Sequence, residues 1–190
     1  DFPSLRGLFE EYICDNLKLK NLLSLFLSCS RPRLVQSMYF EGNTATAAHQ
    51  DSYYLDDEEI GRMAAAWIAL EDIQWNSGRF FICPQSHKVD NSDQNRSNSF
   101  TNMQKFLEDI ISMIRENKYE IRAPYLKKGD ILIWNSLTIH GALSDIDPVN
   151  SRSSITAHFT RSNKKFRTYR HKLEDLVVEK RKHMDVHRLY

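Results

Sequence analysis

The sequence lacks the short motifs that identify several large classes of enzyme. It contains no P-loop, no glycine-rich dinucleotide-binding pattern, no G-x-S-x-G nucleophile motif and no internal repeat. These absences exclude P-loop and dinucleotide-binding folds, hydrolases with a nucleophile elbow, and repeat proteins. A catalytic site therefore has to be sought in residues that lie far apart in the sequence.

Long hydrophobic runs are also absent. The longest apolar runs, Leu22 to Cys29 and Met63 to Leu70, fall well short of the roughly 20 residues that a membrane-spanning helix needs. We therefore expect no transmembrane helix, no membrane partner and a cytoplasmic protein. Because the chain begins at Asp1 rather than at a methionine, we expect its natural beginning to be missing.

Cysteine is scarce. The three cysteines, Cys14, Cys29 and Cys83, are an odd number, have no C-x-x-C spacing and lie in apolar surroundings. This pattern favours a reduced protein in which the thiols are buried packing residues rather than ligands or disulfide partners.

The chain also lacks an excess of charge of one sign. Lys and Arg number 26 against 25 Asp and Glu, which gives a formal net charge of +1. No global field would attract nucleic acid or an anionic membrane. Basic residues do accumulate in the segment 162–190, which we interpret as a solvated helix face rather than as a nucleic-acid site. We expect a small-molecule partner, and the sequence does not indicate an oligomeric state.

At 190 residues and 22.3 kDa, the chain has the length of one well-buried domain. We predict a helical part over 1–31, a β core over about 33–160 with a helical insertion at 99–117, and a C-terminal helix over 162–190. The first part is expected to break into two helices at Asp15-Asn16. The acidic run 56–59 is read as a solvated loop or helix start.

Short segments with strand-like patterns, separated by turns, make up the predicted core. We predict strands at 34–40, 63–70, 79–84, 120–127, 131–134 and 153–159. Such a series, with helices mainly at the two ends, indicates an antiparallel barrel or jelly roll with flanking helices.

The triplet His49-Gln50-Asp51 is the centre of the functional hypothesis. In an extended segment, residues two apart project to the same side, so His49 and Asp51 can direct an imidazole and a carboxylate at one point. His140, which follows the apolar run Ile131 to Trp134, is the best candidate for a further ligand. Two histidines and one carboxylate leave half of an octahedron open, an arrangement associated with non-haem Fe(II) oxygenases.

Arg152 precedes the last predicted core strand. An arginine that enters a barrel interior needs an anion, because an unpaired buried charge is very costly. A dicarboxylate that chelates iron at one end and meets the guanidinium at the other would satisfy it.

Motifs in a fixed order resemble one known family. They are Thr46-Ala47-Ala48-His49-Gln50-Asp51, Trp67-Ile68-Ala69-Leu70-Glu71-Asp72, Gly78 with Pro84-Gln85-Ser86-His87-Lys88, Lys128-Gly129-Asp130, His140-Gly141 and Arg152. Together they resemble the phytanoyl-CoA dioxygenase-like enzymes over roughly residues 34–160. The resemblance implies a double-stranded β-helix core of the jelly-roll or cupin-like type, Fe(II), 2-oxoglutarate and O2. It also implies hydroxylation of an unactivated carbon, with release of succinate and CO2.

The same resemblance assigns roles to individual residues. It implies that His49, Asp51 and His140 bind the metal, that Arg152 holds the distal carboxylate of 2-oxoglutarate, and that Trp67 lines the co-substrate pocket. Ala142 stands where relatives often have a serine that helps to hold 2-oxoglutarate. We expect Thr156 or Tyr39 to replace that hydrogen bond.

Two other functions remain open from the sequence. One is a non-catalytic jelly-roll protein that binds a ligand or a metal, which the loss of a hydroxyl at Ala142 favours. The other is a Zn(II) hydrolase with the same three ligands, which Arg152 disfavours because a zinc-bound water needs no dicarboxylate anchor. His158 shares a strand face with Arg152, and its spacing fits a pocket residue and a hydrogen-bonded core histidine equally well.

Overall fold

The fold is given by a computed structural model that describes residues 3–42, 45–88, 103–146, 150–168 and 172–188. The helices are α1 (Pro3–Cys14), α2 (Leu17–Leu27) and α4 (Met103–Glu116), and the short 3-10 helices are η1 (Asp51–Tyr53) and η2 (Ser86–Lys88). The strands are β1 (Pro32–Phe40), β2 (Thr46–His49), β3 (Asp56–Asp57), β4 (Ala64–Ala69), β5 (Phe80–Ile82), β6 (Ile131–Asn135), β7 (His140–Ala142), β8 (Ser154–Arg161), β9 (Phe166–Arg167), β10 (Leu173–Glu174), β11 (Val178–Lys180) and β12 (Asp185–His187). Within the described ranges, no helix is both long and apolar enough to cross a membrane.

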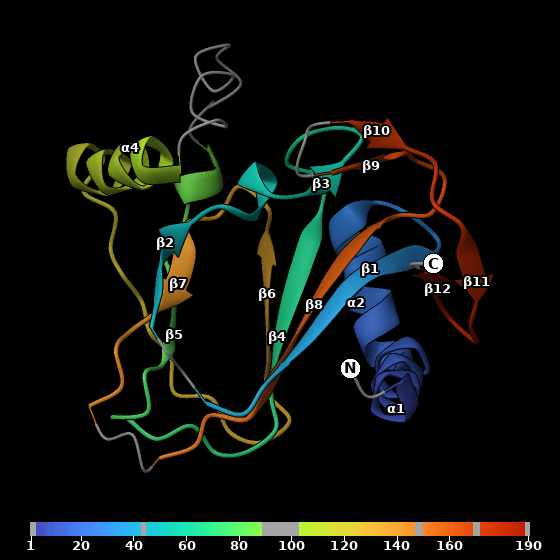
Figure 1. The fold of residues 1–190 in the computed structure, drawn as a ribbon, viewed down its shortest axis with the longest axis horizontal. Helices are drawn as coiled ribbons and strands as arrows, with labels where there is room; N and C mark the ends of the chain where they lie inside the picture. Colours follow the sequence, from blue (N-terminus) through green and yellow to red (C-terminus); the bar gives the residue numbers. More distant parts are fainter. Residues whose placement is uncertain (1–2, 43–44, 89–102, 147–149, 169–171, 189–190) are drawn as a thin grey trace.

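A six-stranded sheet forms the centre of the molecule, with the strand order β11-β12-β1-β8-β4-β6. A three-stranded sheet, β2-β7-β5, lies to one side of it, and a smaller one, β10-β9-β3, lies near one end (Figure 1). Apart from the parallel pair β1 and β12, the paired strands are antiparallel. Mainly antiparallel strands in facing sheets agree with the predicted jelly roll.

Strand β4 shows why an alanine-rich run folds as a strand here. All of its residues are buried, because both faces of the large sheet are covered. Ala64, Ala66 and Ile68 belong to the core under the N-terminal helices, whereas Ala65 and Trp67 belong to a second core on the other face. Because successive residues of β4 enter two different apolar cores, the strand contains no polar residue.

Helices α1 and α2 cover the outer face of the large sheet (Figure 1). Leu23 and Leu27 of α2 are buried against strand residues such as Ile155 and Phe159. The predicted break between the helices is confirmed, since Asn16 caps α2 by accepting a hydrogen bond of 2.9 Å from the backbone N–H of Leu19. The opposite face of the sheet is thereby left for the functional site.

Helix α4 confirms the predicted helical insertion. Phe106 and Ile110 pack against Tyr53, Cys83 and Ile139, which fixes the helix over the small sheet β2-β7-β5. The expected beginning of this helix before Met103 lies outside the described residues.

The predicted C-terminal helix over 162–190 is wrong, because the described part of this segment forms β9 to β12. Strand β12 pairs in parallel with β1, with Asp185 opposite Arg33 and Val186 opposite Leu34. Met184 and Val186 are buried in the core under the N-terminal helices. These apolar contacts come from residues far away in the sequence, so the local spacing gave a misleading helical pattern.

Two smaller predictions are also wrong. Residues 120–127 form no strand and contribute an isolated bridge between Arg122 and Ile82. The acidic run is not solvated at its start, since Asp56 and Asp57 have no exposed surface. Asp56 accepts hydrogen bonds from backbone N–H groups and from Ser136, and Asp57 pairs with Arg161 at 2.6 Å.

Candidate metal centre

The two proposed histidine ligands meet through strand pairing. In the antiparallel pair β2 and β7, His49 lies directly opposite His140. Their imidazole centroids are 4.3 Å apart. The close approach of these strands depends on Gly141, since a β-carbon there would lie 2.6 Å from the backbone oxygen of Thr46.

Asp51 reaches the same point because the backbone between it and His49 is extended. Gln50 has φ −121° and ψ 134°, and its side chain points elsewhere to donate to the backbone oxygen of Leu137. The Oδ1 atom of Asp51 lies 3.4 Å from Nε2 of His140 and 3.8 Å from Nε2 of His49. One atom from each of His49, Asp51 and His140 can be chosen so that all three lie within 4.8 Å of one another.

Backbone contacts hold both rings in the orientation that a metal requires. Nδ1 of His49 lies 2.9 Å from the carbonyl oxygen of Ala47, and Nδ1 of His140 lies 2.9 Å from that of Thr138. A carbonyl can only accept, so each Nδ1 carries a proton, which leaves Nε2 as the ring atom that would bind a metal. Such outer contacts are typical of metal-binding histidines, and the donor set fits a divalent transition metal.

The electrostatics of the three groups also suit a cation. Burial, aided by the neighbouring His140, lowers the pKa of His49 to about 4, so that this ring is neutral at physiological pH. Burial would raise the pKa of Asp51, but His140 and His158 outweigh it and hold that pKa well below its usual value. Burial would lower the pKa of His140, but the neighbouring Asp51 carboxylate outweighs it, so that this pKa is raised. The site thus presents a buried carboxylate among imidazoles.

A cavity of about 400 Å³ opens beside the candidate ligands. Its wall includes His49, Asp51 and His158, and the rest of it is mainly apolar. The apolar contributors are Met38 from β1, Ala47 from β2, Leu55, and Met103 and Leu107 from α4. The predicted insertion therefore supplies part of the cavity wall.

Arg152 lies on the same side of the large sheet, two residues before β8 begins at Ser154. It is 4% exposed, and its Nη1 atom donates a 2.9 Å hydrogen bond to the backbone oxygen of Gly78. Its guanidinium lies 5.8 Å from the ring centroid of Trp67, and its Nε atom has no hydrogen-bond partner among the described residues. Burial lowers the pKa of Arg152 to about 10, with Asp145 opposing that shift. A buried cation with an unused donor is suited to an anionic ligand.

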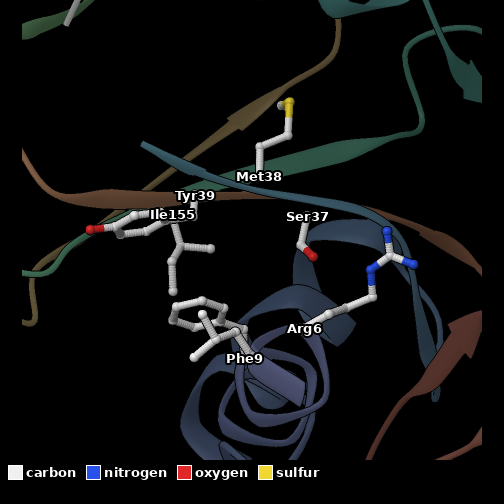
Figure 2. A pocket seen from close by; sticks show the side chains of 7 residues that line it. Arg6, Phe9, Ser37, Met38, Tyr39 and Ile155 are labelled. Atoms are coloured by element: carbon white, nitrogen blue, oxygen red, sulfur yellow. The ribbon is translucent and has the colours of Figure 1, made fainter. Parts of the chain in front are cut away.

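Thr156 and Tyr39, the two candidates for an additional hydrogen bond, lie on opposite faces of the sheet. Thr156 is buried, lies opposite Trp67 in the register of β8 and β4, and shares the face of His158. Tyr39 stacks on Phe9 of α1 with centroids 5.8 Å apart, whereas the neighbouring Met38 points away from this helix (Figure 2). The structure therefore removes Tyr39 from the candidate co-substrate residues. Tyr39 lies on the face covered by α1 because β1 has a bulge near its start, where the register shifts between Leu34 and Gln36.

Two further residues lie near the candidate ligands: His158, for which the sequence left a pocket role open, and Trp134, for which it predicted none. Nε2 of His158 lies 3.6 Å from Oδ1 of Asp51, and Nε1 of Trp134 donates a 2.9 Å hydrogen bond to Oδ2. The spacing in the sequence was a signal for His158, because it lies six residues after Arg152 and residues an even number apart share a face of an extended segment. No local signal distinguishes Trp134 from an ordinary core residue.

The fold and the site together define the class of jelly-roll proteins with a centre of two histidines and one carboxylate. The family model described as phytanoyl-CoA dioxygenase (PhyH) matches residues 8–146. The chain belongs to the phytanoyl-CoA dioxygenase family.

Curated relatives agree with this assignment. The chain is 31% identical over 160 residues to phytanoyl-CoA dioxygenase domain-containing protein 1 of Danio rerio, an alignment that covers 79% of the chain and 49% of the relative. It is 39% identical over 71 residues to the Bos taurus protein of the same name, covering 34% of the chain and 24% of the relative. The chain thus spans about half the length of the Danio rerio relative.

Solved structures confirm the fold. The epimerase SnoN from nogalamycin biosynthesis, in complex with Fe3+, alpha ketoglutarate and nogalamycin RO, aligns with a TM-score of 0.64 at 19% identity, covering 88% of this chain and 62% of that one. EctD from S. alaskensis with bound Fe aligns with a TM-score of 0.63 at 16% identity, covering 90% and 57%. The predicted jelly-roll, cupin-like architecture is confirmed.

Proposed function

We propose that the chain is a non-haem Fe(II)- and 2-oxoglutarate-dependent oxygenase. The observation that carries the proposal is the convergence of His49, Asp51 and His140 beside a cavity, with Nδ1 of both rings anchored on backbone carbonyls. Family membership and the iron- and alpha ketoglutarate-bound structural neighbours support the same function. We also propose that residues 1–190 act as one domain, because β1 near the beginning pairs with β12 near the end.

The three proposed ligands, His49, Asp51 and His140, would hold Fe(II) through two imidazole nitrogens and one carboxylate oxygen. When bound, Fe(II) supplies the redox chemistry by which O2 and a 2-oxo acid generate an oxidant for carbon, with succinate and CO2 as products. The contribution of the chain is to fix the donor atoms in place. The backbone carbonyls of Ala47 and Thr138 hold the imidazoles, and the indole of Trp134 holds the carboxylate.

Arg152 would bind the distal carboxylate of 2-oxoglutarate. Its unused Nε donor, its burial and the flat wall provided by Trp67 support this role. Thr156 lies opposite Trp67 and shares a face of β8 with His158, so its hydroxyl would serve the co-substrate where Ala142 offers none. A zinc hydrolase would have no use for this arrangement.

The substrate would be a small organic molecule with an apolar part, and the reaction would be hydroxylation of an unactivated carbon. Met38, Leu55 and Leu107 in the cavity wall support an apolar contact near the metal.

Anaerobic titration with Fe(II), with and without 2-oxoglutarate, tests the proposal. We expect the weak visible charge-transfer band of the iron chelate to appear only when both are present, and succinate to form when O2 is admitted. Folded, metal-loaded protein without that band would refute the proposed function. The band without any succinate would instead support the non-catalytic binding protein.

A further inference from the structure

A third imidazole faces the carboxylate of the candidate metal centre. His158 is 4% exposed, and its Nε2 atom lies 3.6 Å from Oδ1 of Asp51, which is comparable with the distances of His49 and His140 from that oxygen. Yet the group of three ligand atoms that lie within 4.8 Å of one another does not include His158. The role of this ring therefore differs from that of the other two.

The hydrogen-bond partners of the rings distinguish those roles. Nδ1 of His49 and Nδ1 of His140 each contact a carbonyl oxygen, which places the proton on Nδ1 and the lone pair on Nε2. Nδ1 of His158 is buried and has no partner among the described residues. A proton there would face no acceptor, and the lone pair of Nε2 would then point at a carboxylate oxygen. The favourable neutral form of His158 carries its proton on Nε2, directed at Asp51.

We propose that His158 and Trp134 are positioning residues that fix Asp51 as a ligand through a single oxygen. Trp134 occupies Oδ2 with its indole N–H at 2.9 Å, and His158 directs its Nε2–H toward Oδ1 from the other side. A carboxylate held in this way cannot rotate to bind a metal with both oxygens. The coordination position that a second oxygen would take stays free for another ligand.

The surroundings of the two donors keep them in place. His158 lies in the middle of the large sheet, with Gln36 of β1 opposite it on one side and Ala65 of β4 on the other. The indole of Trp134 packs against the rings of Phe80 and His140, with centroids 4.9 Å and 4.8 Å away. The indole cannot leave Asp51 without disturbing these ring contacts.

The proposal rests on the metal site of the proposed function but not on 2-oxoglutarate. Zn(II), which is diamagnetic, allows the prediction to be read by NMR of ¹⁵N-histidine-labelled protein without co-substrate. We expect two imidazoles to carry their proton on Nδ1 and to bind the metal through Nε2. A third imidazole, whose signals are missing from the spectrum of His158→Gln, should carry its proton on Nε2. A metal-bound Nε2 or an Nδ1 proton at His158 would overturn the proposal.

Substitutions test the proposed positioning role in a second way. His158→Leu removes the donor, whereas His158→Gln keeps an N–H donor of similar reach. Trp134→Phe removes the other donor and retains an aromatic ring. Met38→Leu is a matched control, because Met38 lines the same cavity but has no hydrogen-bond donor to offer Asp51.

We expect His158→Leu and Trp134→Phe to weaken Zn(II) binding by about tenfold or more, and His158→Gln and Met38→Leu to stay close to the unaltered protein. Unchanged affinity in folded His158→Leu would show that His158 only fills space, which contradicts the proposal. Equal losses in His158→Leu and His158→Gln would also contradict it, because a donor would then not suffice. A failure to form the 2-oxoglutarate chelate refutes the proposed function without changing either Zn(II) result.

Discussion

Gly141 lies against the backbone of Thr46 so closely that a β-carbon on Gly141 would come within 2.6 Å of the Thr46 carbonyl oxygen. This contact joins β7, which carries His140, to β2, which carries His49. Phe81 on the other neighbouring strand is equally close, with a ring atom 2.8 Å from the same position. Only glycine allows the three strands to approach in this way.

Gly141→Ala should therefore separate the two proposed histidine ligands. We expect a loss of about 1–3 kcal/mol in the free energy of unfolding from overpacking, together with weaker Zn(II) binding. Gly7→Ala is the control, because nothing lies within 4 Å of a β-carbon there and the residue is helical, so about 0.5–1 kcal/mol should be gained. Urea unfolding and Zn(II) titration measure the two effects, and unaltered Zn(II) affinity in Gly141→Ala would contradict the expectation.

Arg152→Ala should act on the co-substrate rather than on the metal. Removal of one partner of a buried, hydrogen-bonded charge pair costs about 2–5 kcal/mol, which corresponds to a loss of 2-oxoglutarate affinity of about 30-fold or more. Fe(II) affinity should remain similar. Arg122→Ala, which removes an exposed partner of Glu120, is the control and should change neither. If Arg152→Ala weakened both ligands equally, Arg152 would be structural.

Asp51→Ala should abolish the stabilisation that a metal provides. A metal present at 100 times its dissociation constant adds about 2.7 kcal/mol to the free energy of unfolding of the unaltered protein. We expect no such increase in Asp51→Ala and a full increase in Asp109→Ala, whose carboxylate lies on the exposed face of α4. Thermal unfolding with EDTA and with Zn(II) makes the comparison, and metal-dependent stabilisation of Asp51→Ala would remove Asp51 from the ligand set.

The pair of Asp57 and Arg161 should stabilise the fold far more than its surface neighbours do. Asp57 is completely buried, and Arg161 reaches both of its oxygens, at 2.6 Å and 3.2 Å. Asp57→Ala leaves this arginine without its main partner, so we expect a loss of about 3–5 kcal/mol in chemical denaturation. Glu59, which also contacts Arg161, is half exposed, and Glu59→Ala should cost far less than Asp57→Ala because an exposed ion pair is screened by solvent. Similar losses for the two variants would refute this account.

The sequence predicted those parts of the fold in which the determining contacts are local or repeated. The break at Asp15-Asn16 and the insertion helix follow from capping and from an apolar stripe. Strand β4 was predicted correctly although its alanines favour a helix, because its short length and the turn after it outweighed propensity. The long-range partners of β12 left no such signal, and the segment after Ser162 was therefore mistaken for a helix.

The candidate site divides in the same way. His49, Asp51, His140 and Arg152 were predicted from residue type, spacing and order, and the structure brings the first three together. Tyr39, which was expected to offer a hydrogen bond to the co-substrate, lies on the face covered by α1, because one bulge in β1 changes the face on which every later residue of that strand lies. The role of Trp134 depends on an indole contact between β6 and η1, which no sequence pattern reveals.

The pairing of β2 with β7 also determines when the metal centre can form during synthesis. A growing chain that has emerged only as far as α4 presents His49 and Asp51 but has not yet supplied His140, Trp134 or His158. Strand pairing over so long a stretch of sequence is slow, and His49 and Asp51 are only two of the three proposed ligands. The three groups can therefore meet only after β7 has been synthesised and has paired with β2.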